Sequence, residues 1–500
     1  MTSGVLELSV DGVETIQLPS DDTVTRVRLC FAVGARDEVL SEQGVLHVLE
    51  HLVMRAAKDT PLEVNASVGH TVTEFVASGP AALVGDHLER LCRARADPPV
   101  GRMATEAPVV AAEIDGDDGL HQALLAARYG FRDLGSGAVT GPGPDGLRLE
   151  QVRAATRWFV DQNAVLLVDG PLPPDLRLPL PSGAPPTHRR VAPRRRDGAA
   201  ALLVDAPACM VSLLLPPSDP GRFDELAVEL VRQRLLDVVR HEKGLTYVVD
   251  DELFVDVPHA TGGAGSDLLI GAEPLESQLV PAVQAFVVAL LELLGEGPRG
   301  EELDRARERV LLARQGRQAA ADRALDEALN RRLGAVPPRL DVERLRSADV
   351  ATAATYLRPL RDDALFALPD DPAFDLDALG LKETSIPPLC DGPLPPGRRF
   401  RPPLVARALS SAARQDELSL DADGLHVRLE GEVQSVRWDD VVGVLEEDEH
   451  ELAVFGGDGS TVVVGSNLWR GGQALTTAVR SSVDPGLVFP RSSLLSAPED

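Results

Sequence analysis

The hydrophobic pattern of the N-terminal third of the chain predicts strands and helices in mixed order. Between residues 24 and 33, apolar side chains alternate with polar ones, as they do in a half-buried strand. Residues 42–57 instead carry apolar side chains at helical spacing. By the same criteria we expect strands at 5–10, 24–33, 63–67, 71–78 and 164–168, and helices at 42–57, 81–95, 105–130 and 149–162. The pattern therefore predicts an α+β domain over residues 1–170.

A second block, residues 199–380, begins again with strands and a long helix. Two strands and a helix are expected at 200–205, 210–215 and 224–241. Because this order is similar to that of the first block, we expect a duplicated α+β unit. The intervening residues 171–198 are rich in proline and arginine, which predicts a linker. We expect its basic run, Arg194 to Arg196, to be solvated.

The C-terminal part shows short β segments at close spacing. A second proline-rich linker is expected at 381–408, before strands that are separated by turns such as Asp423-Gly424. A helical stretch from Gly471 to Ser482 closes the set. We therefore expect a small antiparallel sheet capped by one helix over 409–490, followed by a disordered tail at 491–500.

This C-terminal unit resembles bacterial pleckstrin-homology-like domains, most clearly around residues 436–441, Val-Arg-Trp-Asp-Asp-Val. Such a resemblance implies a packing, partner-binding or lipid-binding module. Residues 409–490 have no obvious basic patch. We therefore expect packing or partner binding rather than recognition of a lipid headgroup.

Composition indicates a soluble protein with an acidic surface. Hydrophobic residues make up 44% of the 500 residues and charged residues 26%, and this length predicts several domains. The formal net charge of -28 excludes nucleic acid as a partner, because phosphates require a basic surface. The charge favours basic peptides as partners, although a solvated acidic surface without a partner is the simpler interpretation.

Targeting signals and cysteine usage favour a cytoplasmic protein. The first residues lack the basic and apolar segments of a secretory signal. The richest apolar run, residues 279–294, contains Gln284 and Glu292, so it predicts a core helix and no membrane span. The cysteines are far apart in the sequence and match no disulfide framework or thiolate metal site: Cys30, Cys92, Cys209 and Cys390.

The strongest chemical signal is the segment His47-Val48-Leu49-Glu50-His51. On a helix, residues i and i+4 share a face, so both imidazoles can bind one metal ion. Glu50 lies on the same face and can act as a general base for an attacking water without binding the metal. The alternative is a pair of surface histidines in a charged stripe. The apolar residues around the motif argue for a buried helix instead, where such polar groups need partners.

A metal site of this kind needs a third protein ligand. Residues 105–114 predict a helix that carries Glu106 and Glu113 two turns apart on one face. Taken alone, two glutamates on a helix usually indicate exposure to solvent. The His47/His51 pair makes them candidates for the metal site.

Residues 33–51 resemble the zinc helix of the pitrilysin/insulysin family of metallopeptidases, which includes mitochondrial processing peptidase. That family carries His-x-x-Glu-His and a later Glu-x6-Glu pattern. The resemblance implies that His47, His51 and Glu113 bind Zn²⁺, that Glu50 is the general base, and that Glu106 supports the site.

Two further segments resemble the same family. Asn65 and Ala66 match its edge strand, to which the substrate backbone adds as an extra strand. Arg240 and Tyr247 match its Arg-x6-Tyr pair, which binds substrate and stabilises the reaction intermediate. Without the resemblance, this pair is an ordinary salt-bridging arginine and a core tyrosine.

The chain departs from the family in one respect. The interval between His51 and Glu113 is shorter than usual, and the missing residues fall between Met54 and Asn65. We expect this shortening to remove a helix and to open the wall of the substrate cleft near the metal.

These residues together predict a cytoplasmic zinc metalloendopeptidase whose substrate is a peptide, with a leader or precursor peptide as one candidate. The family resemblance also implies a homodimer, or a heterodimer with a related subunit, because the peptidase-like part covers only half of the longer relatives. Two alternatives remain at this point. One is a non-catalytic scaffold in a larger complex, and the other is an adaptor that acts through its C-terminal unit.

Overall fold

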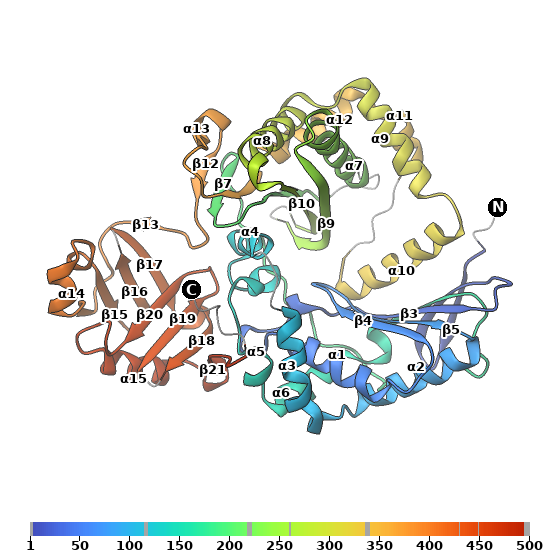
Figure 1. The fold of residues 1–500 in the computed structure, drawn as a ribbon, viewed down its shortest axis with the longest axis horizontal. Coiled ribbons are helices and arrows are strands. Elements are labelled where there is room, and N and C mark those ends of the chain that lie inside the picture. The colour runs from blue at the N-terminus through green and yellow to red at the C-terminus, as the bar shows by residue number, and fades with distance from the viewer. Residues whose placement is uncertain are drawn as a thin grey trace.

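The structure, a computed structural model, describes residues 4–114, 119–217, 223–259, 262–335, 341–429, 431–448 and 450–494. Three units of mixed helix and sheet are arranged side by side, each with its own sheets (Figure 1). The predicted mixture of helix and sheet is confirmed.

The first unit is a six-stranded sheet in the order β1-β2-β6-β3-β5-β4. Its strands are β1 (Leu6–Val10), β2 (Val13–Leu18), β3 (Thr25–Phe31), β4 (Glu63–Val68), β5 (Thr73–Gly79) and β6 (Ala164–Asp169). Its helices are α1 (Val45–Ala56), α2 (Ala81–Ala96), α3 (Met103–Ile114), α4 (Leu120–Tyr129), α5 (Gly143–Gly146) and α6 (Leu149–Ala155). Strand β4 forms one edge, so one side of its backbone has no neighbouring strand in this sheet.

The second unit has a six-stranded sheet in the order β12-β7-β11-β8-β10-β9. Its strands are β7 (Ala200–Val204), β8 (Cys209–Leu215), β9 (Thr246–Pro258), β10 (Ala264–Pro274), β11 (Leu365–Pro369) and β12 (Lys382–Thr384). Its helices are α7 (Asp224–Leu235), α8 (Leu279–Glu296), α9 (Gly300–Ala313), α10 (Arg317–Leu333), α11 (Val342–Ser347), α12 (Val350–Arg361) and α13 (Leu376–Leu379). A π-helical turn, Leu236–Glu242, continues α7.

The two sheets share a topology. In each, the second and third strands of the order are parallel, and the remaining inner neighbours are antiparallel. The outermost pairs differ, because β1 runs antiparallel to β2 whereas β12 runs parallel to β7. This common order is what a duplicated unit produces.

Each of the first two units contributes a helix that packs on the sheet of the other. Helix α10 covers one face of the first sheet, where Leu325 and Leu329 pack with Ile16 and Leu167. Helix α4 packs in the same way on the second sheet. Because an inner strand such as β6 needs apolar cover on both faces, this exchange closes both cores and ties the two units together.

Helix α8 is long and apolar enough to cross a membrane, by length and composition alone. Its mean hydropathy is 1.8, and 56% of it is buried inside the protein. It packs in the core of the second unit against α7 and α12, and no other helix in the described ranges meets the same test.

The third unit contains two sheets, in the orders β13-β17-β16-β15-β14 and β20-β19-β18-β21. Its strands are β13 (Cys390–Asp391), β14 (Arg398–Phe400), β15 (Glu417–Leu420), β16 (Gly424–Leu429), β17 (Glu432–Arg437), β18 (Val441–Asp448), β19 (Glu451–Gly456), β20 (Thr461–Gly465) and β21 (Val488–Pro490). Its helices are α14 (Leu404–Leu409) and α15 (Gly472–Ser482).

The linker expected at 381–408 differs from what the structure shows. Residues 382–384 add β12 to the second sheet, and β13, β14 and α14 belong to the third unit. Edge strands tolerate proline and need little periodicity, so the composition of this stretch concealed them. Of the tail expected at 491–500, residues 495–500 lie outside the described residues. Ser493 instead donates hydrogen bonds to Asp145 from both its backbone N–H, at 2.8 Å, and its hydroxyl, at 2.6 Å.

The basic run in the linker at 171–198 is only partly solvated, because Arg195 is exposed whereas Arg194 and Arg196 are half-buried, which corrects the expectation in part. Arg194 donates to the backbone carbonyls of Ile386 and Asp458. Arg195 forms an ion pair with Asp363 at 2.6 Å. Arg196 donates to the carbonyl of Ala127 at 2.8 Å. These arginines therefore join all three units, because carbonyls left free at segment ends require donors.

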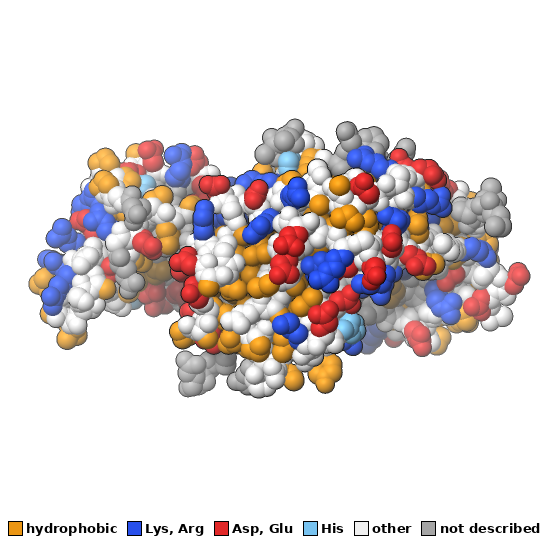
Figure 2. Space-filling view, turned by 90° about the horizontal axis from the view of Figure 1, so that it is seen from above, with side chains coloured by type: hydrophobic (Ala, Val, Ile, Leu, Met, Phe, Trp, Pro, Cys, Tyr) orange, Lys and Arg blue, Asp and Glu red, His pale blue; other side chains and the backbone are white. Residues whose placement is uncertain are grey.

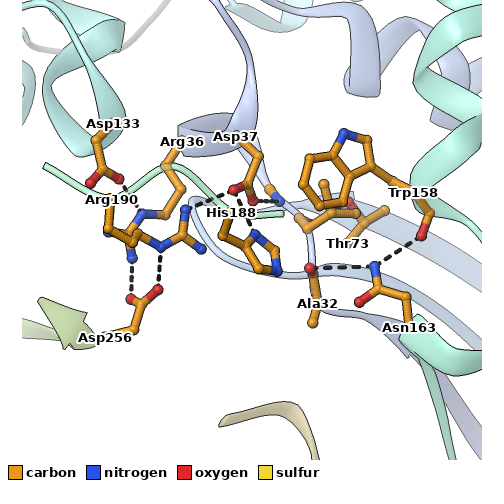
Figure 3. A network of polar contacts seen from close by, with 12 residues as sticks. Ala32, Arg36, Asp37, Thr73, Asp133, Trp158, Asn163, His188, Arg190 and Asp256 are labelled. Carbon is orange, nitrogen blue, oxygen red and sulfur yellow. Dashed lines mark hydrogen bonds and ion pairs between the residues drawn. The ribbon is translucent and has the colours of Figure 1, made fainter. Parts of the chain in front are cut away.

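A buried polar network fastens the same linker between the first two units (Figure 3). Arg36, whose side chain is fully buried, contacts Asp133 at 2.5 Å and also pairs with Asp256 on β9. Burial opposes the charge of Arg36, but the two carboxylates outweigh it and raise its pKa. From the linker, Arg190 pairs with Asp37 at 2.7 Å and with Asp256.

The third unit also rests on the first through apolar contacts. Phe131 packs edge-on against Phe455, with ring centroids 6.0 Å apart. Leu40, Val139 and Phe489 complete the same buried cluster. The C-terminal unit therefore shares a core with the segment just before α1, and it is not an independent appendage.

Candidate metal centre and substrate pocket

Helix α1 places the three motif residues at the bottom of a pocket. Its apolar residues Val48, Leu49 and Leu52 are buried against the sheet. The helix begins after Gly44, whose φ of 84° is accessible to glycine at low cost. Both carboxylate oxygens of Glu38 accept hydrogen bonds from the first turn, from Gly44 N at 2.7 Å and Leu46 N at 2.8 Å. This cap fixes the start of the helix just before His47.

Two imidazoles and two carboxylates converge on one point. The rings of His47 and His51 are 5.0 Å apart between centroids, and the ligand atoms of His47, Glu50 and His51 lie within 4.8 Å of one another. From α3, Oε2 of Glu113 lies 3.3 Å from Nε2 of His47 and 3.2 Å from Nε2 of His51. Two imidazoles and one carboxylate form a donor set that suits Zn²⁺.

Glu106, two turns before Glu113 on α3, lies on the Nδ1 side of the His51 ring, whereas Glu113 lies on the Nε2 side. Its side chain is only 3% exposed, and Oε2 lies 4.0 Å from Nδ1 of His51. The other oxygen accepts a hydrogen bond of 2.8 Å from Nε of Arg55. At 4.0 Å this contact is electrostatic and is longer than a hydrogen bond, so Glu106 favours one orientation of the ring through its charge.

Glu50 occupies a more enclosed position than Glu113. Its side chain is 8% exposed, compared with 53% for Glu113. Burial raises the pKa of Glu50, whereas the charges of His51 and Arg95 lower it in part. A carboxylate with a raised pKa accepts a proton readily near neutral pH, as a general base must.

The buried cation near Glu50 is Arg95, which lies in unusually apolar surroundings. Arg95 on α2 is fully buried among phenylalanines, with its guanidinium carbon 3.6 Å from the ring centroid of Phe159 and 4.2 Å from that of Phe75. Within the described ranges, none of its three guanidinium nitrogens has a hydrogen-bond partner. Burial lowers its pKa to about 9, and Glu50 opposes that shift.

The pocket above these residues has a volume of about 1330 Å³. The residues that line it include Asn65 and Ala66 on strand β4 and the loop of residues 137–141. Because β4 is an edge strand, its free backbone groups face a space in which an extended peptide can form a further strand.

The segment between α1 and β4 is short. Between Ala56 and Glu63 the chain forms no helix, and β4 follows almost at once. Met54, Arg55 and Lys58 line the pocket directly. That this shortening opens the wall of the substrate cleft stays a prediction.

The structure does not bring Arg240 and Tyr247 to this pocket. Neither residue lines it, Arg240 is exposed, and the side chain of Tyr247 is 72% exposed. Within one chain, the described residues therefore place His47, Glu50, His51, Glu106, Glu113, Asn65 and Ala66 together, and leave the arginine–tyrosine pair apart.

Sequence reasoning missed three residues around the site: Glu38, Arg95 and Ile386. Glu38 lies six residues before Gly44, outside the spacing that predicts a cap, so it gave no local signal. Arg95 sits in an otherwise ordinary amphipathic helix and gave no signal. Ile386, which lines the pocket from the supposed linker, could be placed only by the tertiary fold.

A histidine–glutamate contact joins the two units beside the pocket. His70, in the turn after β4, lies 3.4 Å from Oε1 of Glu252 on β9, and His121 lies 3.3 Å from Oε2. Burial opposes the charge of Glu252, but His70 and His121 outweigh it and lower its pKa. The edge strands of the two sheets are thus tied at one point.

Solved structures with the same fold include several peptidases. A protease from Helicobacter pylori matches with 16% identity and a TM-score of 0.58, over 73% of this chain and 99% of that chain. The M16 peptidase inactive domain from Pseudomonas fluorescens matches with 16% identity and a TM-score of 0.56, over 73% and 97%. Pitrilysin matches with 16% identity and a TM-score of 0.51, over 74% of this chain and 45% of that chain.

The sequence comparisons add nothing to this likeness, since no family model and no curated protein matches the chain. At 16% identity, the similarity to the solved structures concerns the fold. The chain therefore has the fold of these solved structures, which include a protease and an M16 peptidase domain that is described as inactive.

Proposed function

We propose that this chain is a zinc-dependent metallopeptidase. The observation that carries the proposal is the convergence of His47, His51 and Glu113 beneath a pocket walled by an edge strand. The donor set fits the metal: two imidazoles and a carboxylate face one point, and a second carboxylate, Glu50, lies beside them. Without a cation, this gathering of lone pairs has little to stabilise it.

In this proposal His47, His51 and Glu113 bind the zinc ion. When bound, zinc supplies the Lewis acid that polarises the scissile carbonyl and favours deprotonation of the attacking water. Glu50 accepts the proton from that water and later delivers it to the leaving amine. Glu106 and Arg55 keep the ring of His51 in position.

The substrate is proposed to be an extended peptide that adds to β4. Backbone hydrogen bonds to an edge strand are independent of sequence, so they align a peptide without selecting its side chains. Asn65 and Ala66 lie on the part of β4 that lines the pocket. The scissile bond would then be presented above Glu50.

The test is a Glu50→Gln variant assayed for zinc and for hydrolysis of a generic quenched peptide. Gln keeps the shape of the side chain but cannot accept the proton, so hydrolysis should fall about 10²–10⁴-fold while zinc stays bound. Glu63→Gln, an exposed position at the start of β4, is the matched control and should behave as the parent. Near-normal turnover by a fully metallated Glu50→Gln protein contradicts the proposed mechanism.

The second candidate function is that of a non-catalytic subunit. It is favoured by the likeness to the Pseudomonas fluorescens domain, which is described as inactive. A scaffold role predicts no metal-dependent hydrolysis by the parent protein under any condition. The same assay therefore separates the two candidates before any variant is made.

We further propose that the active form is a dimer, with a second copy or with a related subunit. Arg240 and Tyr247 lie outside the pocket of their own chain, and Tyr247 is 72% exposed. A partner chain could present this pair to the pocket and enclose it, which strengthens electrostatic interactions there.

Complementation tests this arrangement. His51→Ala and Tyr247→Phe should each be nearly inactive as homodimers. A mixed dimer has one site with both lesions and one with neither, so it should recover substantial activity. No recovery in confirmed mixed dimers shows that Tyr247 does not act across the interface, and an active monomer contradicts the dimer itself.

A further inference from the structure

A local reversal of charge in this acidic chain lies in the segment before the C-terminal sheet. The chain has a net charge of -28, yet residues 392–415 contain no Asp or Glu. The same stretch contains five arginines: Arg398, Arg399, Arg401, Arg407 and Arg414. A positive segment of this length on a negative protein creates a local field of opposite sign.

The same segment carries the most exposed aliphatic side chains. On helix α14, Leu404 is 64% exposed, Val405 71% and Leu409 84%. Leu409 is the most exposed large hydrophobic side chain in the part of the chain that the structure describes. Exposing three such side chains together is unfavourable in water, which is why clustered apolar residues on a surface usually mark an interaction site.

This segment is built into the fold. Strand β14 pairs with β15, and Phe400 is buried in the core of the C-terminal unit. After the helix, Nε of Arg414 donates to the carbonyl of Arg407 at 2.8 Å, which ties the end of the helix. The apolar side chains are therefore displayed from a fixed position.

The tip lies at the outer end of the molecule. In Figure 1, α14 forms the left-hand edge, away from α1 and β4, which bear the candidate metal centre. Figure 2, which views the molecule from above, shows basic and hydrophobic side chains mixed at this end. None of the residues of α14 lines the large pocket.

We propose that this tip is a peripheral binding site for an anionic bilayer surface. The aliphatic side chains of α14 enter the boundary between headgroups and acyl chains, and the arginines contact the anionic headgroups. Because most of the protein is negative, an anionic surface repels other faces and attracts this one. The protein would therefore approach the bilayer with this tip leading.

The shape of the tip favours a bilayer over an acidic protein. A stable protein interface usually buries more than about 1,000 Å² in total, whereas α14 is a single short helix that projects from an edge. A fluid interface needs no complementary groove to accept projecting side chains. Arg399 and Arg401 are partly neutralised by Glu417, at 3.8 and 3.3 Å, which leaves Arg398, Arg407 and Arg414 as the larger contributors.

The inference does not depend on peptidase activity, and binding can be measured directly. The full chain is sedimented with vesicles of phosphatidylcholine alone, and with vesicles that also contain phosphatidylglycerol. We expect binding to the anionic vesicles only, with a strong decrease at high salt. Arg398→Gln should weaken binding roughly fivefold. Arg401→Gln should weaken binding by less, because Glu417 already neutralises part of the charge of Arg401.

The apolar contribution is tested with a triple variant, Leu404→Ser, Val405→Ser and Leu409→Ser. Its substituted side chains are exposed, so the fold should be unchanged by circular dichroism, while vesicle binding falls on the order of tenfold or more. A matched control is Leu275→Ser with Leu312→Ser, which are 56% and 54% exposed in the second unit and should bind as the parent does.

Three results would overturn the proposal. The first is no preference for anionic over neutral vesicles, and the second is parental binding by the folded triple variant. The third is binding to polyglutamate, or self-association, that depends on α14 while vesicles do not bind. That result would assign the tip to an acidic protein or to a second copy of this chain instead.

Discussion

Helices α1 and α7 have the same place in two sheets of the same topology, yet they carry different chemistry. Each follows the fourth strand in its sheet order and packs near an edge strand. On α7, the charged side chains are paired: Glu225 with Arg314, and Arg234 with Glu302 at 2.7 Å. In the part of the chain that the structure describes, these side chains of α7 therefore have partners of opposite charge.

On α1 the balance is different. His47, Glu50 and His51 face a further carboxylate, Glu113, and the nearest buried cation, Arg95, is enclosed by aromatic rings. An excess of acceptors at one point disfavours the site unless a cation is present. The comparison shows that the shared fold supplies a scaffold, and that a few side chains on one helix decide whether it can bind metal.

The largest expected effect is on bound zinc and peptide hydrolysis, and one substitution on each helix tests it. His51→Ala should remove bound zinc and reduce peptide hydrolysis to background, because two ligands bind zinc far more weakly than three. Gln233→Ala, which removes a buried polar residue from α7 and its 2.6 Å hydrogen bond to Glu229, should leave zinc and activity nearly unchanged. Metal analysis after dialysis and a peptidase assay provide the measurement. Equal zinc content in both variants would contradict the distinction between the helices.

The chemistry of α1 was accessible from the sequence because it is local. Helical periodicity alone puts His47 and His51 on one face, and the helix expected at 42–57 is observed at Val45–Ala56. Glu113 was proposed through a resemblance, and the fold brings its Oε2 to 3.2 Å from His51.

What the sequence could not provide depends on contacts between distant segments. Arg95 becomes notable only when Phe31, Phe75 and Phe159, from three different segments, close around it. Arg194 to Arg196 were expected to be solvated because composition does not record where the carbonyls and carboxylates of other units will lie. The same limit hid β14 and α14 in a proline-rich stretch.

The next largest effect is expected on the free energy of unfolding, from the buried ion pairs of Arg36 that join the first two units. Arg36→Met should leave Asp133 buried without its cation and Asp256 with Arg190 alone, and should lower the free energy of unfolding by about 3–5 kcal/mol. Arg177→Met, which breaks an exposed pair with Asp11, should change it little. Urea unfolding followed by circular dichroism measures both. A small effect of Arg36→Met would mean that the network is not what fastens β9 to the first unit.

A smaller effect should follow from the residue that supports His51. Glu106→Gln keeps the shape but removes the charge that faces Nδ1 of His51 and the guanidinium of Arg55. We expect zinc affinity to fall about 10–100-fold, as is usual when the partner of a metal-binding histidine is changed. Competition with a fluorescent chelator measures the affinity, with Glu63→Gln as the control. Unchanged affinity would show that the orientation of His51 is fixed by packing alone.

The smallest effect is expected where the two edge strands meet, at Glu252. Its pKa is lowered in the folded protein by His70 and His121, so its contribution to stability is present above the ordinary pKa of a glutamate, about 4.3, and is lost as the pH falls through the lower folded value. Because the side chain is 45% exposed, solvent screening should limit the contribution at pH 7 to less than about 1 kcal/mol. Glu252→Gln should therefore unfold at a slightly lower urea concentration than the parent at about pH 5.5, which is below the ordinary pKa of a histidine, about 6.5, and the two curves should converge as the pH falls through the lowered pKa of Glu252. Asp251→Asn, at the neighbouring position where burial raises the pKa, should not destabilise the protein at pH 7. A difference between parent and Glu252→Gln that persists undiminished at acid pH would show that the contact of β9 with His70 and His121 does not depend on the carboxylate charge.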